Sequence, residues 1–239
     1  MASKKSKTKK LVVSALTRAE RSLRDHPKEP PSWRIFKIMG EFVSGFEFLR
    51  RCHQAVSFFG TARESFNPEI YREATKLAAK LSKDGFAVIT GGGPGVMEAA
   101  NRGAYEAGGR SIGIDIRLPT EQRKNPYVKE SEDFKFFFVR KVMLSFASQV
   151  YIFFPGGFGT LDELFEMLTL VQTKKIDPIP IILVGKKFWD PLIGWVRSEL
   201  YTKNNAIDKE DLDLFYLVDD ANEAYALIKK LIKGKKIIV

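Results

Sequence analysis

The chain has 239 residues, 44% of them hydrophobic, which suffices for one sizeable core. A single cysteine excludes an intrachain disulfide and a cysteine-rich metal site, and two histidines argue against a histidine-based zinc centre. No apolar stretch approaches the ~20 residues that span a bilayer, and the basic N-terminus lacks the apolar core of a secretory signal, so we expect a cytoplasmic protein with no membrane partner.

The net charge of +10 is concentrated near the N-terminus. Residues 1–37 carry eleven Lys and Arg against three Asp and Glu, whereas the rest of the chain carries 28 against 26. We therefore expect residues 1–30 to form a basic, disordered tail whose contact with nucleic acid is weak and non-specific. An organellar presequence is an alternative, because no acidic residue precedes Glu20.

A helix is expected to start at Ser32, as its cap, and to run to about Arg51. Its apolar residues recur at helical spacing, and we expect this face to pack on the domain or on a second subunit of a homo-oligomer, a dimer or larger. We expect residues 31–239 to form one domain, with residues 31–52 as its N-terminal packing helix. The apolar residues are Trp33, Phe36, Met39, Phe42, Val43, Phe46 and Leu49.

The remaining chain alternates between strand and helix patterns. This alternation predicts an α/β fold, a Rossmann-like doubly wound parallel sheet with helices on both faces, preceded by the N-terminal helical extension. Residues 117–132 are polar and contain proline, so we expect a loop there. Strands are expected at 55–59, 86–90, 111–116, 134–138, 149–154, 179–184 and 214–218, and helices at 67–84, 96–108, 139–147, 160–173, 189–200 and from Asp220.

Three of the expected strands end in glycine-bearing loops: Gly60-Thr61, Gly91–Gly95 and Gly156–Gly159. The carboxyl ends of parallel strands lie at one edge of a sheet, where ligands bind near the switch point. Glycine lets backbone N–H groups approach an anion, and a helix N-terminus adds partial positive charge. We therefore expect a shared phosphate or nucleotide site.

Comparison of the glycine loops with known nucleotide-binding motifs indicates which class of nucleotide the site would bind. No match to the Walker loop exists, and the dinucleotide fingerprint fits only partly, because Val96 stands where its last glycine should be. Asp115 lies about 20 residues further on, where an NAD-binding acid would sit, so an NAD(P)-linked oxidoreductase is an alternative. Two phosphate-type loops facing one pocket favour a compact mononucleotide.

Charged residues accompany the last loop. Thr160-Leu161-Asp162-Glu163 is expected to open a helix, with two carboxylates in its first turn. The segment also fits a capping box, in which the Glu163 carboxylate would bond back to the backbone at Thr160 instead of facing a substrate. Arg140-Lys141 begins another expected helix, where positive charge opposes the dipole by ~0.3–1 kcal/mol and invites an anionic partner, a salt bridge or solvation.

Together these residues resemble the Lonely Guy (LOG) family, often labelled "possible lysine decarboxylase". Its signature P-G-G-x-G-T-x-x-E is present as Pro155 to Glu163, with the family's Arg-Lys pair fifteen residues before the proline. The segments Gly91–Ala99 and Ser57–Arg63 are similar to the family's first glycine loop and opening strand, and the resemblance extends from about Trp33 to Ile228. The long first helix and Leu118–Gln122 look like the longer, second subgroup.

The resemblance implies an enzyme that hydrolyses the N-glycosidic bond of AMP or of a cytokinin riboside 5′-monophosphate, giving free base and ribose 5-phosphate. We expect no cofactor and no metal. Arg140 and Glu163 would be the catalytic pair. Glu98 departs from the glycine usual in the plant-type motif. The substrate-binding positions carried over are Gly60, Thr61, Gly92, Gly93, Gly95, Met97, Glu98, Glu121, Lys141, Gly156, Gly157, Phe158, Gly159, Thr160 and Thr169.

The chemistry suits these residues, because a carboxylate stabilises the cation-like ribose of glycosidic cleavage. A non-catalytic nucleotide or cofactor carrier on the same fold stays an alternative. The sequence gives the decarboxylase label little support, because no lysine lies in a setting suited to a Schiff base with pyridoxal phosphate. The sequence does not separate AMP from cytokinin riboside monophosphates, which differ only at the N6 substituent.

Overall fold

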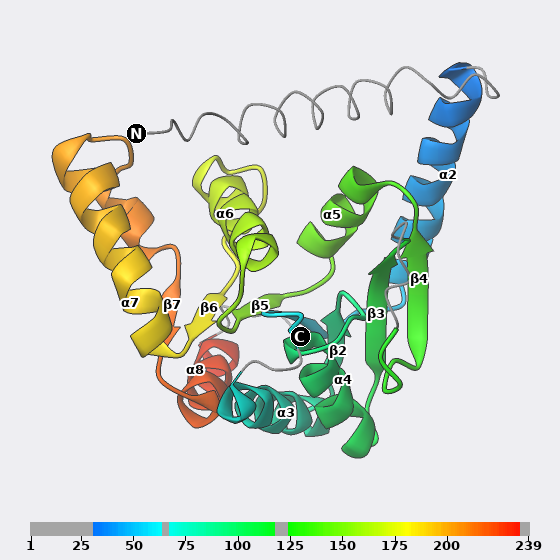
Figure 1. Cartoon of the computed structure of the whole chain (residues 1–239), viewed down its shortest axis with the longest axis horizontal. Coiled ribbons are helices and arrows are strands. Elements are labelled where there is room, and N and C mark those ends of the chain that lie inside the picture. Colours follow the sequence, from blue (N-terminus) through cyan, green and yellow to red (C-terminus); the bar gives the residue numbers. More distant parts are fainter. Residues whose placement is uncertain (1–30, 64–66, 118–123, 235–239) are drawn as a thin grey trace, which may run out of the picture. The chain divides into compact units, whose positions relative to one another are not determined.

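The computed structural model describes residues 31–63, 67–117 and 124–234 (Figure 1). The expected tail over residues 1–30 and the expected site residue Glu121 lie outside these ranges. Residues up to Gly40 and residues from Glu41 onward form two separate units, and helix α2 (Pro31–Leu49) crosses the boundary. In the described part of the chain, no helix combines the length and the apolarity that crossing a membrane requires.

The unit that begins at Glu41 is built on a seven-stranded sheet in the order β4-β3-β2-β1-β5-β6-β7, with every neighbouring pair parallel. The four central strands are buried along their whole length, as a parallel sheet covered on both faces requires. The predicted α/β doubly wound fold is confirmed. The strands are β1 (Ala55–Phe59), β2 (Ala87–Thr90), β3 (Ser111–Ile116), β4 (Glu130–Phe134), β5 (Val150–Phe153), β6 (Ile181–Val184) and β7 (Tyr216–Val218).

Helices cover the two faces in separate groups (Figure 1). Helices α3 (Pro68–Lys83), α4 (Val96–Glu106) and α8 (Ala221–Lys233) lie on one face, and α5 (Phe137–Ser145) and α6 (Phe158–Gln172) lie on the other. Side chains alternate accordingly along β5, where Ile152 joins the first core and the Tyr151 hydroxyl donates to the Ser145 carbonyl of α5 at 2.8 Å. Helix α7 (Lys186–Trp195) continues into a π-helix (Val196–Lys203) and is followed by a short 3-10 helix (Lys209–Asp213).

The switch point of the sheet lies between β1 and β5. These strands are neighbours, yet the helices that follow them, α3 and α6, cover opposite faces. Two helices that diverge in this way leave a crevice above the carboxyl ends of the strands. The first and third glycine loops follow β1 and β5, so the topology places both at this crevice.

The segment before the Arg-Lys pair differs from its prediction. Strand β4 covers residues 130–134, where a loop was expected to 132, and α5 begins at Phe137, where the chain was expected to be extended. β4 is an edge strand with the polar sequence Glu-Ser-Glu-Asp, so it lacks the apolar signal of a buried strand. The two residues before α5 are held by the Glu41 carboxylate, which accepts from the backbone N–H groups of Lys135 and Phe136 at 2.9 and 3.1 Å.

Other helix starts follow local rules. Asn67 caps α3 by accepting from the Glu69 N–H at 2.9 Å, and the helix begins at Pro68, one residue after the expected start. Helix α2 begins at Pro31, a residue favoured at the first helical position, so the prediction of Ser32 as the cap is wrong. In the C-terminal half of α2, Gly45 and Phe48 are buried, whereas Val43 and Phe46 of the predicted apolar face are exposed. Their covering by a second subunit stays a prediction.

Helices α3 and α4 pack closely at a glycine, which generates a stability prediction. A Cβ added at Gly103 would overlap the backbone carbonyl of Thr75, whereas one added at Gly194 in α7 would meet open space. We expect Gly103→Ala to destabilise the fold by about 1–3 kcal/mol through overpacking. Gly194→Ala, the matched control, should be neutral or stabilise by up to ~1 kcal/mol. Urea unfolding of both variants tests this; a stabilising Gly103→Ala would contradict the packing.

Candidate active site

The three glycine loops meet at the switch point. The Thr61 N–H after β1 donates to the Pro155 carbonyl after β5 at 3.1 Å, and the Val96 N–H of the second loop donates to the Thr61 carbonyl at 2.9 Å. A Cβ at Gly60 would overlap the Val96 side chain, so the close approach of the loops requires glycine there. The prediction that the loops share one edge of the sheet is confirmed.

A cavity of about 630 Å³ opens beside these loops. It contains both members of the expected catalytic pair together with much of the expected phosphate-binding backbone. A cavity of this volume is in the range of small-molecule sites. The expected site residues that line it are Gly60, Thr61, Met97, Arg140, Gly156, Gly157, Gly159, Thr160 and Glu163.

Helix α6 begins two residues before the start of the expected helix at 160–173. Its cap is Gly157 and its first residue is Phe158, so Thr160 is the third helical residue. The capping-box interpretation is therefore wrong, because Thr160 is not the cap and Glu163 is not the third residue. The placement of Asp162 and Glu163 in the first turn is wrong as well. The Glu163 carboxylate is left free of its own helix terminus.

The early start also places the N-terminus of α6 at the cavity. The first N–H groups of a helix have no partner within the helix, and the helix dipole favours negative charge there. A Cβ added at Gly157 or Gly159 would meet nothing within 4 Å, so both glycines present bare backbone to open space. The arrangement suits a phosphate group.

Glu163 is a buried carboxylate with 7% of its surface exposed. Burial raises its pKa to about 7, because desolvation outweighs the lowering by Lys141 and Arg140. Among the described residues, the cation nearest to it in an ion pair is Lys141, whose Nζ lies 3.9 Å from Oε1. A carboxyl group that titrates near neutrality can both hold a charge and exchange a proton at physiological pH.

Lys141 sits within the acidic side of α6. Its Nζ lies 2.5 Å from the Asp162 carboxylate and 3.0 Å from that of Glu166. Burial opposes the charge of Lys141, but its bonds to Asp162 and Glu166 outweigh burial and raise its pKa. Lys141 thus counters the three carboxylates at this end of α6 from outside the cavity lining.

The side chain of Arg140 is positioned by a hydrogen bond to strand β3. Its Nε donates to the Ile114 carbonyl in β3 at 2.8 Å, and its terminal NH2 group lies where a Cβ at Gly91 would be. Burial lowers the pKa of the guanidinium, and the charges of Glu163 and Asp115 act in the opposite direction. Arg140 is the fourth residue of α5, at the end of its first turn, so the predicted conflict with the helix dipole is still present, though it is weaker than at the first residue. The expected anionic partners are these two carboxylates.

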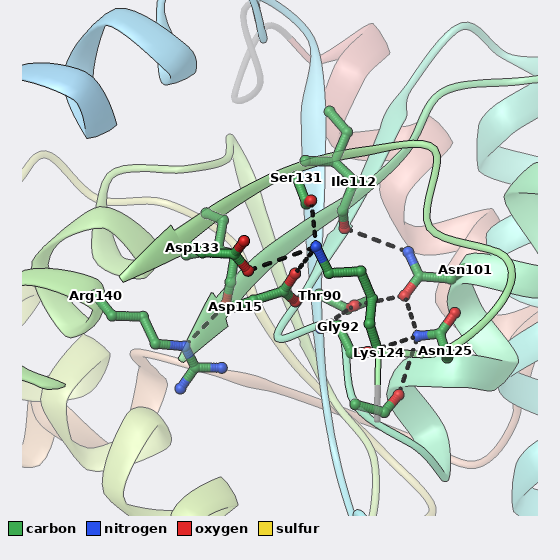
Figure 2. A network of polar contacts seen from close by, with 12 residues as sticks. Thr90, Gly92, Asn101, Ile112, Asp115, Lys124, Asn125, Ser131, Asp133 and Arg140 are labelled. Atoms are coloured by element: carbon green, nitrogen blue, oxygen red, sulfur yellow. Dashed lines mark hydrogen bonds and ion pairs between the residues drawn. The ribbon is translucent and has the colours of Figure 1, made fainter. Parts of the chain in front are cut away.

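A network of hydrogen bonds between side chains and backbone holds the second glycine loop in place (Figure 2). Asn125 Nδ2 donates to the carbonyls of Gly92 and Gly93 at 3.1 and 3.0 Å, and the Gly92 N–H donates to Thr90 Oγ1 at 2.9 Å. Asn101 links Thr90 to Asn125, because its Oδ1 accepts from Thr90 Oγ1 at 2.6 Å and from Asn125 Nδ2 at 3.0 Å. The network fixes the loop so that Gly91 faces Arg140.

Several expected site residues do not line the cavity. Gly92 and Gly93 are engaged in the network of Figure 2, and Gly95 caps α4. The Glu98 carboxylate accepts from the Tyr71 hydroxyl at 3.1 Å, on the α3 side. Lys141, Phe158 and Thr169 line a neighbouring, shallower hollow on α6, and Phe158 is 92% exposed. Their contacts with a substrate stay predictions.

Some lining residues were missed by the sequence analysis. Arg63 follows the first loop and brings a positive charge to the cavity; its place at the end of the segment Ser57–Arg63 is the sequence signal that points to it. Asp162 was seen only as a helix-start acid. The apolar wall comes from separate strands and helices, which no local pattern links. The other lining residues are Phe59, Ala62, Gly91, Ile116, Phe137 and Leu144.

Known proteins resemble the chain in both sequence and fold. The family model described as "Possible lysine decarboxylase" matches residues 97–228. The rice protein named "Cytokinin riboside 5′-monophosphate phosphoribohydrolase LOG" is 30% identical over 129 residues, covering 52% of each chain. A protein of Mycobacterium marinum named cytokinin riboside 5′-monophosphate phosphoribohydrolase is 24% identical over 160 residues, covering 66% of this chain and 84% of its own. The chain spans about half the length of two of the rice relatives it matches and 70% of a third.

Solved structures share the architecture at low identity. The molybdenum cofactor carrier protein of Chlamydomonas reinhardtii aligns with a TM-score of 0.58 at 23% identity, covering 75% of this chain and 98% of its own. The molybdenum cofactor binding protein of Rippkaea orientalis gives 0.57 at 24% identity, with the same coverage. At this identity the likeness extends to the fold alone.

The burial of Glu163 generates a prediction of pH-dependent stability. Its folded-state pKa of about 7 exceeds the ordinary value of 4.5, so the protonated carboxyl is favoured in the folded state and stability is lost as pH rises through this window. We expect Glu163→Gln to stabilise the protein at pH 8 by roughly 3 kcal/mol, a gain that fades toward pH 4. Thermal unfolding across this pH range measures it.

The control is Glu47→Gln, because Glu47 lies on the surface of α2 in an ion pair with Arg50. This variant should change stability by no more than ~0.5 kcal/mol at any of these pH values. A Glu163→Gln protein that is less stable than the wild type at pH 8 would mean that the charged carboxylate is a structural partner and would contradict the prediction.

Proposed function

The chain belongs to the family described as "Possible lysine decarboxylase", and we propose that it hydrolyses the N-glycosidic bond of a purine nucleoside 5′-monophosphate, AMP or a cytokinin riboside 5′-monophosphate. The observation that carries the proposal is the buried Glu163 carboxylate facing the cavity beside Arg140, next to a helix N-terminus with bare glycine backbone. An anion site and an acid–base group share one cavity.

In this proposal the substrate phosphate binds at the start of α6. The N–H groups from Gly157 to Thr160 and the helix dipole supply the attraction, and Gly157 and Gly159 leave the space. Arg63 also lines the cavity and would add a cation to the phosphate site. The phosphate is remote from the broken bond, so its binding energy serves to orient the sugar.

The ribose then lies over Glu163. Cleavage of the bond between C1′ and the base nitrogen passes through a cation-like ribose, which the ionised carboxylate stabilises. Glu163 also orients the water whose oxygen bonds to C1′, and the departing base takes up a proton. Arg140 holds the ribose or phosphate and favours the ionised form of Glu163. The products are free base and ribose 5-phosphate.

The base would lie against the apolar wall of the cavity. Met97, Ile116, Phe137 and Leu144 offer flat and flexible apolar surface that suits a purine. Decarboxylation through pyridoxal phosphate would require a lysine at the reacting centre, and the cavity-lining residues of the described part include two arginines and no lysine. The residues therefore favour hydrolysis.

The first test is release of base from AMP, GMP, CMP and isopentenyladenosine monophosphate, followed by chromatography. We expect purine release from AMP or its isopentenyl derivative, a fall in kcat of at least about a hundredfold in Glu163→Gln, and a large loss in Arg140→Lys. A protein that binds AMP in calorimetry yet releases no base would be a carrier, which would overturn the proposed enzyme.

Arg63 provides a test of the phosphate end. Because the proposal places Arg63, which lines the cavity, at the phosphate and not at the glycosidic bond, Arg63→Ala should raise KM for AMP about tenfold with a smaller effect on kcat. Arg72→Ala is the matched control, since Arg72 is exposed on α3 and does not line the cavity. Steady-state kinetics with AMP decides; equal KM values in the two variants would remove Arg63 from the phosphate site.

A further inference from the structure

We propose that Asp115 is a positioning residue for Arg140, and that Lys124 holds Asp115 in this role; the inference rests on the proposed function for its effect on turnover. Neither residue lines the cavity. In the view of Figure 2, Asp115, near the carboxyl end of β3, lies between Arg140 and the Nζ of Lys124.

The backbone of β3 fixes one edge of the guanidinium. Arg140 Nε donates to the carbonyl of Ile114, the residue before Asp115, at 2.8 Å. A guanidinium has five N–H donors in a planar fork, so one bond at Nε sets the direction in which the remaining donors point. A shift of β3 at this position would therefore turn the arginine relative to Glu163.

The Asp115 carboxylate occupies a space made for it. Asp115 is 8% exposed, and a Cβ added at Gly92 or Gly113 would overlap or crowd its Oδ1. Gly92 also has a φ of +71°, which non-glycine residues rarely adopt. Both the backbone conformation and the space taken by Asp115 therefore require glycine at this position. Consecutive glycines thus make room for the two groups, Gly91 for Arg140 and Gly92 for Asp115.

Lys124 anchors the carboxylate from outside. Its Nζ lies 2.8 Å from Asp115 Oδ2, 3.5 Å from Asp133 Oδ1 and 2.6 Å from Ser131 Oγ. Both Asp133 and Ser131 belong to the edge strand β4, so the lysine ties Asp115 to the neighbouring strand. The carboxylate is therefore fixed from β3, β4 and the second glycine loop.

Asp115 gives Arg140 a second counter-charge besides Glu163. A buried guanidinium is costly unless carboxylates compensate it, and the charges of Glu163 and Asp115 both favour its charged form. With Asp115 present, Arg140 does not depend on Glu163 alone. Without it, we expect the guanidinium to turn toward Glu163 and engage the carboxylate that the reaction needs.

The test combines kinetics with NMR of the Arg140 Nε–H group, assigned by its loss in Arg140→Lys. In Asp115→Asn we expect the Nε–H resonance to shift, its exchange with water to accelerate, and kcat for AMP to fall about ten- to a hundredfold with a smaller change in KM. Glu132→Gln is the matched control, because Glu132 lies on the same edge strand and, among the described residues, is not an ion-pair partner of Lys124; it should leave the resonance and kcat unchanged.

Lys124→Gln gives a second, independent perturbation and decides the question by itself if Asp115→Asn does not fold. It should also shift the Arg140 resonance, because Asp115 loses its anchor. A folded Asp115→Asn or Lys124→Gln protein whose Arg140 Nε–H resonance and exchange rate match the wild type would overturn the inference. Failure of the wild type to release base from AMP would overturn the proposed function alone, since the NMR comparison needs no substrate.

Discussion

The site depends on where helix α6 begins. Because Gly157 rather than Thr160 is the cap, the helix N-terminus opens into the cavity, and Glu163 falls one turn further along, out of reach of the terminal backbone. A start at Thr160 would have used the hydroxyl and the carboxylate to satisfy the helix itself. With the early start, the backbone N–H groups are available to an anion, and Glu163 is available to a sugar.

Placing Glu163 there carries an electrostatic cost that the surroundings only partly offset. Burial raises its pKa to about 7 even though Lys141 and Arg140 both favour the charged form. Lys141 is shared with Asp162 and Glu166, and Arg140 with Asp115, so neither cation is committed to Glu163. A carboxylate that lies near cations without a dedicated ion-pair partner is available to a substrate, but its burial lowers the stability of the fold.

The sequence predicted the features that have local signals. Apolar runs located β1 and β3 at their observed ends, Asn67-Pro68 located α3, and three glycine loops indicated a shared site that the structure brings together. Features set by tertiary contacts were missed. β4 is a polar edge strand, and the residues just before α5 are held by Glu41 from another helix. Helix α6 starts at a glycine although Thr160 has the better local capping preference. The apolar wall of the cavity is assembled from separate elements, so no spacing rule reveals it.

The most direct measurement is a crystal structure of the Glu163→Gln protein with AMP bound. The account predicts the phosphate on the backbone N–H groups between Gly157 and Thr160, the ribose C1′ over the side chain at 163, and the base against Met97 and Leu144. AMP bound with its phosphate away from the start of α6, or with C1′ remote from residue 163, would contradict the account.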